Sequence, residues 1–102
     1  MTTKTDIKRF RAIGHKLKPV VTISGNGVSE SVMNEINRAV LDHELIKIRV
    51  NADDRKDRKE TIDLVVQQSQ AELIQTTGNV ALLYKAAPKP NPKLSNILRA
   101  KL

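Results

Sequence analysis

The chain has 102 residues, of which 39% are apolar, which suits one domain with a single modest core and argues against wholesale disorder. It contains no cysteine, so a disulfide framework, a thiolate metal site and a thiol nucleophile are excluded. Eighteen Lys and Arg against eleven Asp and Glu give a formal net charge of +7, which favours a polyanionic partner.

The basic residues gather at the two ends of the chain. The first twenty residues contain one acid, Asp6, and six bases: Lys4, Lys8, Arg9, Arg11, Lys16 and Lys18. The last seventeen contain no acid and four bases: Lys89, Lys93, Arg99 and Lys101. Such segregation indicates that these residues form a surface that contacts a partner. Phe10 and Tyr84 are the only aromatic residues, so a nucleic acid would be held by its phosphates and shape more than by stacked bases.

A 3.6-residue periodicity predicts an amphipathic helix over residues 5–17. One sector of this helix carries the core candidates Ile7, Phe10, Ile13, Gly14 and Leu17. Another sector carries candidate phosphate contacts, namely Lys8, Arg11 and His15, with Lys16 beside them. Pro19 ends the helix and favours extended backbone at Lys18, a further candidate, before a strand over residues 20–23.

A glycine-containing loop connects this strand to a second helix. It reads Ser24-Gly25-Asn26-Gly27, and Ser29 is the expected N-cap of a helix that reaches about His43. Glycine permits positive φ and a close approach of the backbone, while the helix N-terminus favours an anion. We therefore expect these four residues to bind phosphate, with Arg38 on the polar face of the helix as a further candidate.

The remaining pattern predicts the element order α-β-α-β-α-β-β, an α/β or α+β two-layer sandwich. In the strand over 45–50, Ile46, Ile48 and Val50 alternate with Lys47 and Arg49, which predicts helices on one side of the sheet only. On that open face Lys47 and Arg49 are interpreted as bystanders. Asp53 or Asp54 can cap a third helix, whose first turns carry mixed charges expected to pair with one another. A hairpin follows, with strands over 73–76 and 80–85.

The pattern changes after residue 85, which predicts a domain over 1–85 and a basic tail over 86–102. Pro88, Pro90 and Pro92 favour an extended spacer, followed by a marginal amphipathic helix near the end of the chain. We expect this tail to be flexible.

Nothing in the sequence suggests catalysis. His15 and His43 are far apart, and no nucleophile or paired-carboxylate pattern stands out, so we expect no enzyme, no metal and no cofactor. His43 is expected to cap or pack at its helix end, and Tyr84 to lie in the core. Without an apolar run of spanning length or a signal-peptide core, we expect a cytoplasmic protein, without membrane contact, that acts as a monomer.

With these elements placed, the chain resembles the CRM domain, and in particular the stand-alone bacterial YhbY family. The resemblance covers roughly residues 7–85, and it rests on four stretches: Gly14 to Val21, Glu35-Ile36, His43 to Lys47, and Gly78 with Leu83-Tyr84-Lys85. The chain departs from the family pattern at Ser24, the first position of a Gly-x-x-Gly loop. It also has Gly14 where Ala is usual and Lys85 where Arg is usual.

The resemblance implies a four-stranded mixed sheet in the order 1-2-4-3, with helices mostly on one face, as in the C-terminal domain of translation initiation factor three. It also implies binding to structured RNA, namely large-subunit ribosomal RNA in precursor particles, and a role in ribosome assembly. Two alternatives remain open from the residues alone. One is an adaptor whose basic face meets an acidic protein, and the other is a DNA-binding protein of the nucleoid type.

Overall fold

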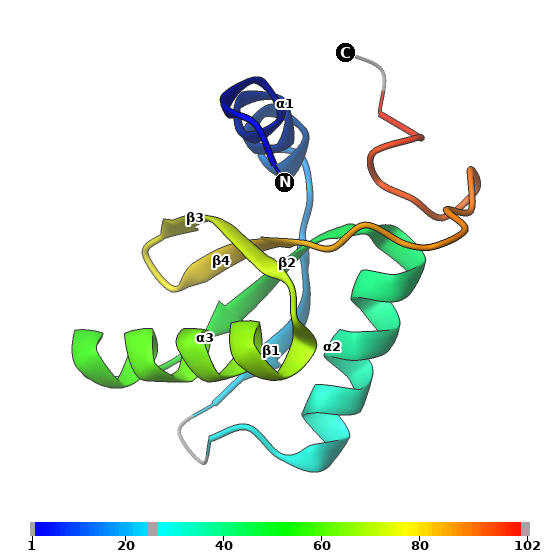
Figure 1. Ribbon diagram of the computed structural model, residues 1–102. Helices are drawn as coiled ribbons and strands as arrows, with labels where there is room; N and C mark the ends of the chain where they lie inside the picture. The colour runs from blue at the N-terminus through cyan, green and yellow to red at the C-terminus, as the bar shows by residue number, and fades with distance from the viewer. Residues whose placement is uncertain (1, 25–26, 101–102) are drawn as a thin grey trace.

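A computed structural model describes residues 2–24 and 27–100. Its elements follow the predicted order: α1 (Lys4–Gly14), β1 (Pro19–Ile23), α2 (Glu30–His43), β2 (Leu45–Val50), α3 (Arg55–Ser69), β3 (Glu72–Thr77) and β4 (Val80–Tyr84). The four strands form one mixed sheet in the order β1-β2-β4-β3 (Figure 1). Both the element order and the strand order are therefore confirmed.

Each helix begins at a side chain that accepts a backbone hydrogen bond. Thr3 and Asp6 form a reciprocal capping box at α1, the hydroxyl of Ser29 accepts from the Val32 N–H at α2, and Asp54 caps α3. These caps satisfy backbone donors that the first helical turn leaves without partners. They explain why the predicted helix starts are accurate to within one or two residues.

The register of the sheet fixes which side chains share a face. β1 runs parallel to β2, with Thr22 opposite Arg49, while β4 runs antiparallel to both β2 and β3. Lys47 is opposite Leu82 and Ile48 is opposite Ala81, so Lys47 and Leu82 lie on one face and Ile48 and Ala81 on the other.

The main core lies between the sheet and the pair α2 and α3, which cover the same face (Figure 1). Its central side chains are almost completely buried, and they come from all three elements: Ile36, Ile46, Ile48, Val65 and Leu83. Ile46, Ile48 and Val50 lie in this core, as the alternation of residues 45–50 predicts.

The expectation of helices on one side only is wrong for α1, which lies across the opposite face of the sheet (Figure 1). There Phe10 and Ile13 pack against Leu45, Ile74 and Leu82 in a second core. The alternation in residues 45–50 did not predict this second core. Leu45 lies on the same face of the sheet as the charged residue Lys47, so that face was expected to be open. One end of this face is therefore apolar and covered, and the other is polar and open.

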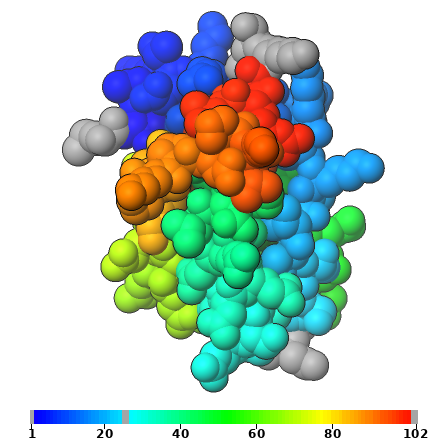
Figure 2. Space-filling view, turned by 90° about the vertical axis from the view of Figure 1, so that its right-hand side faces the viewer, coloured from blue at the N-terminus to red at the C-terminus, as the bar shows by residue number. Residues whose placement is uncertain are grey.

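The prediction of a flexible tail is also wrong. Residues 86–100, here called the strap, form a series of turns without a helix and pack against α1 and the end of α2 (Figure 2). The guanidinium of Arg9 donates to the carbonyl of Ile97, and the side-chain amide of Asn96 donates to the carbonyl of Leu45. Ile97 is 9% exposed and completes the second core, so the strap belongs to the folded domain.

Among the described residues, no helix is both long enough and apolar enough to cross a membrane.

Candidate nucleic-acid interface

The outer surface of α1 carries a row of exposed basic side chains. Lys8, Arg11 and His15 are spaced by three and four residues, so they fall on one face of the helix, and all three are exposed. Lys4, Lys8 and Arg11 also border one shallow hollow. The structure therefore brings three of the predicted contact residues into one row.

A groove of about 330 Å³ separates the C-terminal part of α1 from the open end of the sheet. Its polar lining comes from three segments that are distant in the sequence, and consists of Arg11, His15, Lys47, Gln75 and Thr77. Gly14 and Leu82 belong to its apolar lining. No acidic residue lines this groove, so it favours an anion of the size of a phosphate group.

Gly14 allows α1 to lie this close to the sheet. A Cβ at this position would be 2.7 Å from Cδ2 of Leu82, closer than side chains can approach without a shift. The missing Cβ thus brings Arg11 and His15 toward the sheet face that carries Lys47.

The glycine loop follows β1 at its other end. Gly27 has φ +84°, and its N–H donates to the carbonyl of Ser24 at 3.1 Å. Both residues are exposed, and nothing lies within 4 Å of a Cβ added at Gly27. Positive φ with open space around it is what close approach of a ligand to the backbone requires. Gly25 and Asn26, predicted with them, lie outside the described residues.

The α1 row and the glycine loop do not adjoin each other, because they lie at opposite ends of β1. A strand of five residues spans roughly 16 Å. The open face of the sheet connects the two ends: Lys47 faces the groove, and Arg49 lies opposite Thr22 near the loop. The Asn51 N–H donates to the carbonyl of Ile23 at 2.8 Å and joins the ends of β1 and β2 there. Lys47 and Arg49, interpreted from sequence as bystanders, therefore lie between the two predicted parts.

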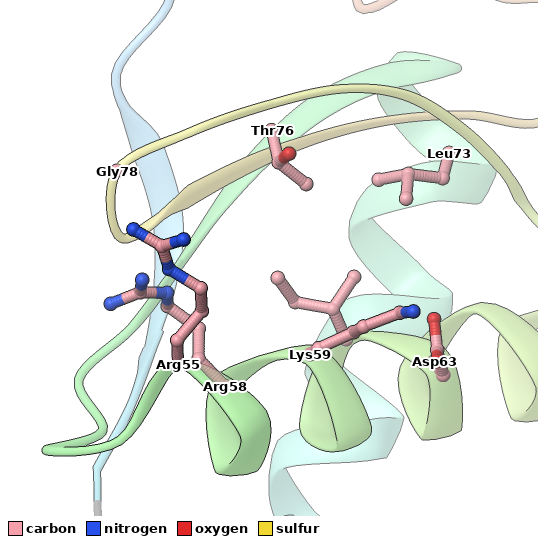
Figure 3. A pocket seen from close by; sticks show the side chains of 8 residues that line it. Arg55, Arg58, Lys59, Asp63, Leu73, Thr76 and Gly78 are labelled. Atoms are coloured by element: carbon pink, nitrogen blue, oxygen red, sulfur yellow. The ribbon is translucent and has the colours of Figure 1, made fainter.

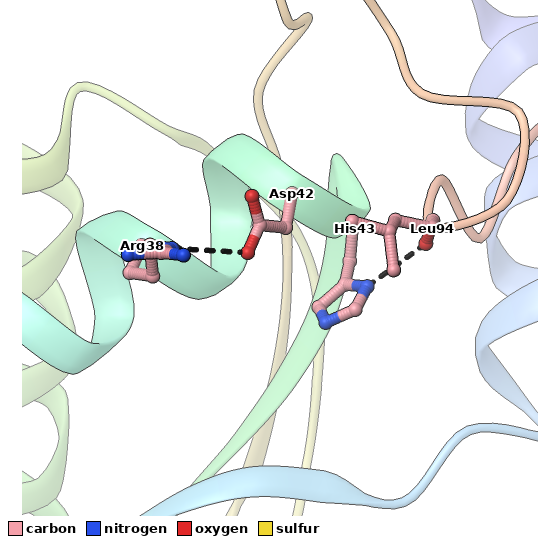
Figure 4. Close-up of polar contacts among 4 residues, drawn as sticks. All are labelled: Arg38, Asp42, His43 and Leu94. Atoms are coloured by element: carbon pink, nitrogen blue, oxygen red, sulfur yellow. Dashed lines mark hydrogen bonds and ion pairs between the residues drawn. The ribbon is translucent and has the colours of Figure 1, made fainter.

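Arg38 is not brought to this face. It lies in the third turn of α2, and its Nε donates to the Asp42 carboxylate at 3.2 Å (Figure 4). In the next turn, Nδ1 of His43 is 2.8 Å from the carbonyl oxygen of Leu94 in the strap, which agrees with a packing role for His43 (Figure 4). Lys16 and Lys18, in the connection from α1 to β1, are exposed.

A second group of bases, Arg55, Arg58 and Lys59, occupies the first turns of α3. Sequence reasoning expected these charges to pair within the helix. In the part of the chain that the structure describes, however, Arg38 and Asp42 form the only ion pair. Arg58 instead donates to the side-chain oxygen of Asn79 at 2.6 Å. The expected self-paired face is therefore wrong, and these cations can meet a ligand.

Tyr84 is partly buried and packs against the second core. Its ring stacks on Phe10, with the centroids 4.5 Å apart and 30° between the planes. Burial raises the pKa of Tyr84 above its ordinary value, and the nearby carboxylates of Glu44, Glu72 and Asp6 raise it further. Both aromatic rings are thus used in packing.

Within residues 2–24 and 27–100, no group of three or more His, Asp or Glu side chains is arranged to hold a metal ion.

The fold defines a class of α+β domain with three helices and a four-stranded mixed sheet, which a solved structure shares. Residues 2–85 match the CRS1/YhbY (CRM) domain, and the chain therefore belongs to that family.

Three relatives illustrate the family. A Pseudomonas aeruginosa protein named as a probable RNA-binding protein is 45% identical over 95% of this chain and 93% of its own. A Haemophilus influenzae RNA-binding protein is 36% identical over 91% of this chain and 95% of its own. The solution structure of a Staphylococcus aureus hypothetical protein, described as a candidate RNA-binding protein, has a TM-score of 0.77 at 25% identity, over 93% of this chain and 98% of its own.

Proposed function

We propose that this protein binds the phosphate backbone of structured RNA and assists assembly of the large ribosomal subunit in the cytoplasm. The observation that carries the RNA-binding part is the acid-free groove, where Arg11, His15 and Lys47 converge from two elements on either side of Gly14. The names of the relatives support the same partner. The ribosomal part is supported by the family resemblance seen in the sequence.

The interface has two parts that contact different segments of the RNA. The α1 row and the groove hold phosphates through Lys8, Arg11 and His15. The glycine loop presents the backbone at Gly27 to another phosphate at the far end of β1. A separation of roughly 16 Å suits two places on a folded RNA better than neighbouring phosphates of one strand.

The composition of the face also favours a structured RNA over an unpaired strand. Proteins that bind single strands without sequence preference stack successive bases on aromatic rings. Phe10 is 4% exposed and the partly buried Tyr84 stacks on it, so both rings are engaged in packing. This face is therefore suited to recognise the backbone and the shape of a structured RNA.

Competition binding tests the RNA-binding part. A fluorescent RNA hairpin should be displaced by unlabelled double-stranded RNA, but not by an acidic peptide of equal charge. Displacement by the peptide would favour the adaptor, and equal displacement by duplex DNA would favour the nucleoid protein.

Crosslinking in cells, followed by sequencing of the bound RNA, tests the ribosomal part. Precursors of large-subunit RNA should be enriched, and equal recovery of all RNAs would contradict this part of the proposal.

A further inference from the structure

A second cavity, of about 420 Å³, lies on the other face of the sheet from the groove. It opens between the first turns of α3 and the edge strand β3, and Gly78 of the hairpin turn closes one end (Figure 3). The cavity lies away from α1, and none of the residues proposed to contact phosphates lines it.

One wall of the cavity is apolar. Ile62 is buried at 4% exposure and forms part of the lining, while Leu73 is 41% exposed and extends from β3 toward α3 (Figure 3). A large, half-exposed leucine at the mouth of a cavity loses contact with water when a flat apolar body enters. This wall therefore suits a ligand with a planar, apolar part.

The opposite wall is cationic. The guanidinium groups of Arg55 and Arg58 lie beside each other near Gly78, and Lys59 extends along α3 (Figure 3). Arg58 is fixed by its 2.6 Å hydrogen bond to Asn79, whose carbonyl accepts from the Val50 N–H. No carboxylate of the described residues pairs with either arginine. Two neighbouring like charges without an acidic partner favour a bound anion.

The cavity also contains groups that can distinguish one polar ligand from another. The hydroxyl of Thr76 lies on the β3 side, and the carboxylate of Asp63 lies on the α3 side (Figure 3). An ionised carboxylate accepts hydrogen bonds and cannot donate them. Asp63 would therefore favour a ligand that carries an amino group, and would repel a phosphate at its own end of the cavity.

We propose that this cavity binds one unpaired nucleotide whose base carries an amino group, such as cytidine. The base packs on Leu73 and Ile62, its amino group donates to Asp63, and its phosphate meets the guanidinium groups of Arg55 and Arg58 at the Gly78 end (Figure 3). This proposal rests on the proposed RNA-binding function. It adds the reading of one base to a domain whose other face contacts phosphates.

Titration of ¹⁵N-labelled protein with nucleotides, followed by NMR, tests the proposal. Cytidine monophosphate should shift the amide signals of Leu73 and Thr76 at concentrations about fivefold lower than uridine monophosphate, which has no amino group. Inorganic phosphate should leave Leu73 unmoved. Equal effects of the two nucleotides, or a Leu73 shift with phosphate alone, would overturn the base preference. No shift with either nucleotide would overturn the site.

Two variants make the test specific. Asp63→Asn should remove the preference for cytidine over uridine, and Leu73→Ser should weaken both nucleotides about fivefold. Leu64→Ser is a matched control, because Leu64 is 40% exposed on the same helix but outside the cavity. A free nucleotide is distinguished from one within RNA by a hairpin with one bulged cytidine, which should bind about fivefold more tightly than the same hairpin with a bulged uridine.

The proposal and the RNA-binding function can fail separately. Replacing Arg11 and Lys47 by Ala should abolish most hairpin binding but leave the shifts caused by cytidine monophosphate. If the wild-type chain binds the hairpin but no nucleotide moves Leu73, the cavity proposal alone is wrong. If the nucleotide binds but the hairpin does not, the RNA-binding function is wrong.

Discussion

The hydroxyl of Ser95 donates a 2.7 Å hydrogen bond to Oε1 of Glu44, and both side chains are buried. The second oxygen of the same carboxylate accepts from the Ala87 N–H at 3.0 Å. Glu44 also has φ +61°, which an L-residue rarely adopts. A buried charge is tolerated only with such partners, so the end of α2 depends on the strap.

The first prediction is that the strap stabilises the domain. Ser95→Ala leaves the Glu44 carboxylate with one donor fewer and should lower the free energy of unfolding by about 2 kcal/mol. Deletion of the residues after Ala87 also uncovers Phe10 and Ile13 and should cost more. Urea denaturation measures both, with the exposed Lys93→Ala as the control. Unfolding of the truncated chain at the wild-type midpoint would show that the strap contributes nothing.

The second prediction concerns salt. If the interface neutralises about four to six phosphates, the affinity for structured RNA should fall with salt along a log–log slope of roughly −3 to −5. Replacing Arg11 and Lys47 by Ala should weaken all RNAs alike and flatten the slope by about 2. Lys89→Ala with Lys93→Ala removes the same charge from the strap and should change the slope much less. Equal losses in the two double variants would mean that net charge, not the groove, controls binding.

The third prediction concerns Gly27. Because its φ is +84°, any residue with a Cβ is strained there by about 1–2 kcal/mol, although nothing nearby would clash. Gly27→Asp also adds a negative charge beside the N-terminus of α2, so RNA binding should be lost while the chain stays folded. Gly27→Ala should be intermediate.

Two controls separate strain from charge at the loop. Gly78 has φ +57° and equally open surroundings, so Gly78→Ala should cost similar stability without affecting the binding of a duplex RNA. Asn37→Asp places the same charge on the exposed side of α2. If Asn37→Asp weakens RNA binding as much as Gly27→Asp, the loop is a connection only.

A fourth prediction follows from the raised pKa of Tyr84. The folded chain favours the protonated phenol, so this group stabilises the fold fully below its ordinary pKa of 10.0. That contribution should be lost as the pH rises through the higher pKa of the folded state. Tyr84 is the only tyrosine and the chain has no tryptophan, so the ultraviolet absorbance of tyrosinate reports this titration directly. Glu72→Gln should lower the midpoint, whereas a midpoint at the ordinary value in the wild type would contradict the prediction.

A fifth prediction concerns the contact between Gly14 and Leu82. Alanine gains about 1 kcal/mol over glycine within a helix, but its Cβ would overlap the Leu82 side chain. Gly14→Ala should therefore stabilise the domain more in a Leu82→Val background than in the wild type. Thermal unfolding of the two single variants and the double variant gives the coupling, and additive changes would show that the two residues do not restrict each other.

The sequence was sufficient for the local structure, and less so for what distant segments build together. Capping residues and periodicity are local, which is why the predicted helix starts at Ser29 and Asp54 agree with the structure. The second core could not be foreseen in the same way, because Ile97 reaches Phe10 only through the fold. Strand alternation correctly placed Lys47 on the face opposite the main core. It could not show that Arg11 and His15 would approach Lys47 across a glycine.

The pairing of Arg9 with the carbonyl of Ile97 joins residues that are 88 positions apart. Phe10 and Ile13 lack part of their apolar cover until Ile97 has docked against them. Among the described residues, the main core contains none after Leu83, so its packing does not depend on the strap. The two cores therefore differ in what they require: the sheet can close on α2 and α3 by itself, whereas α1 is fully secured only when the strap has met it.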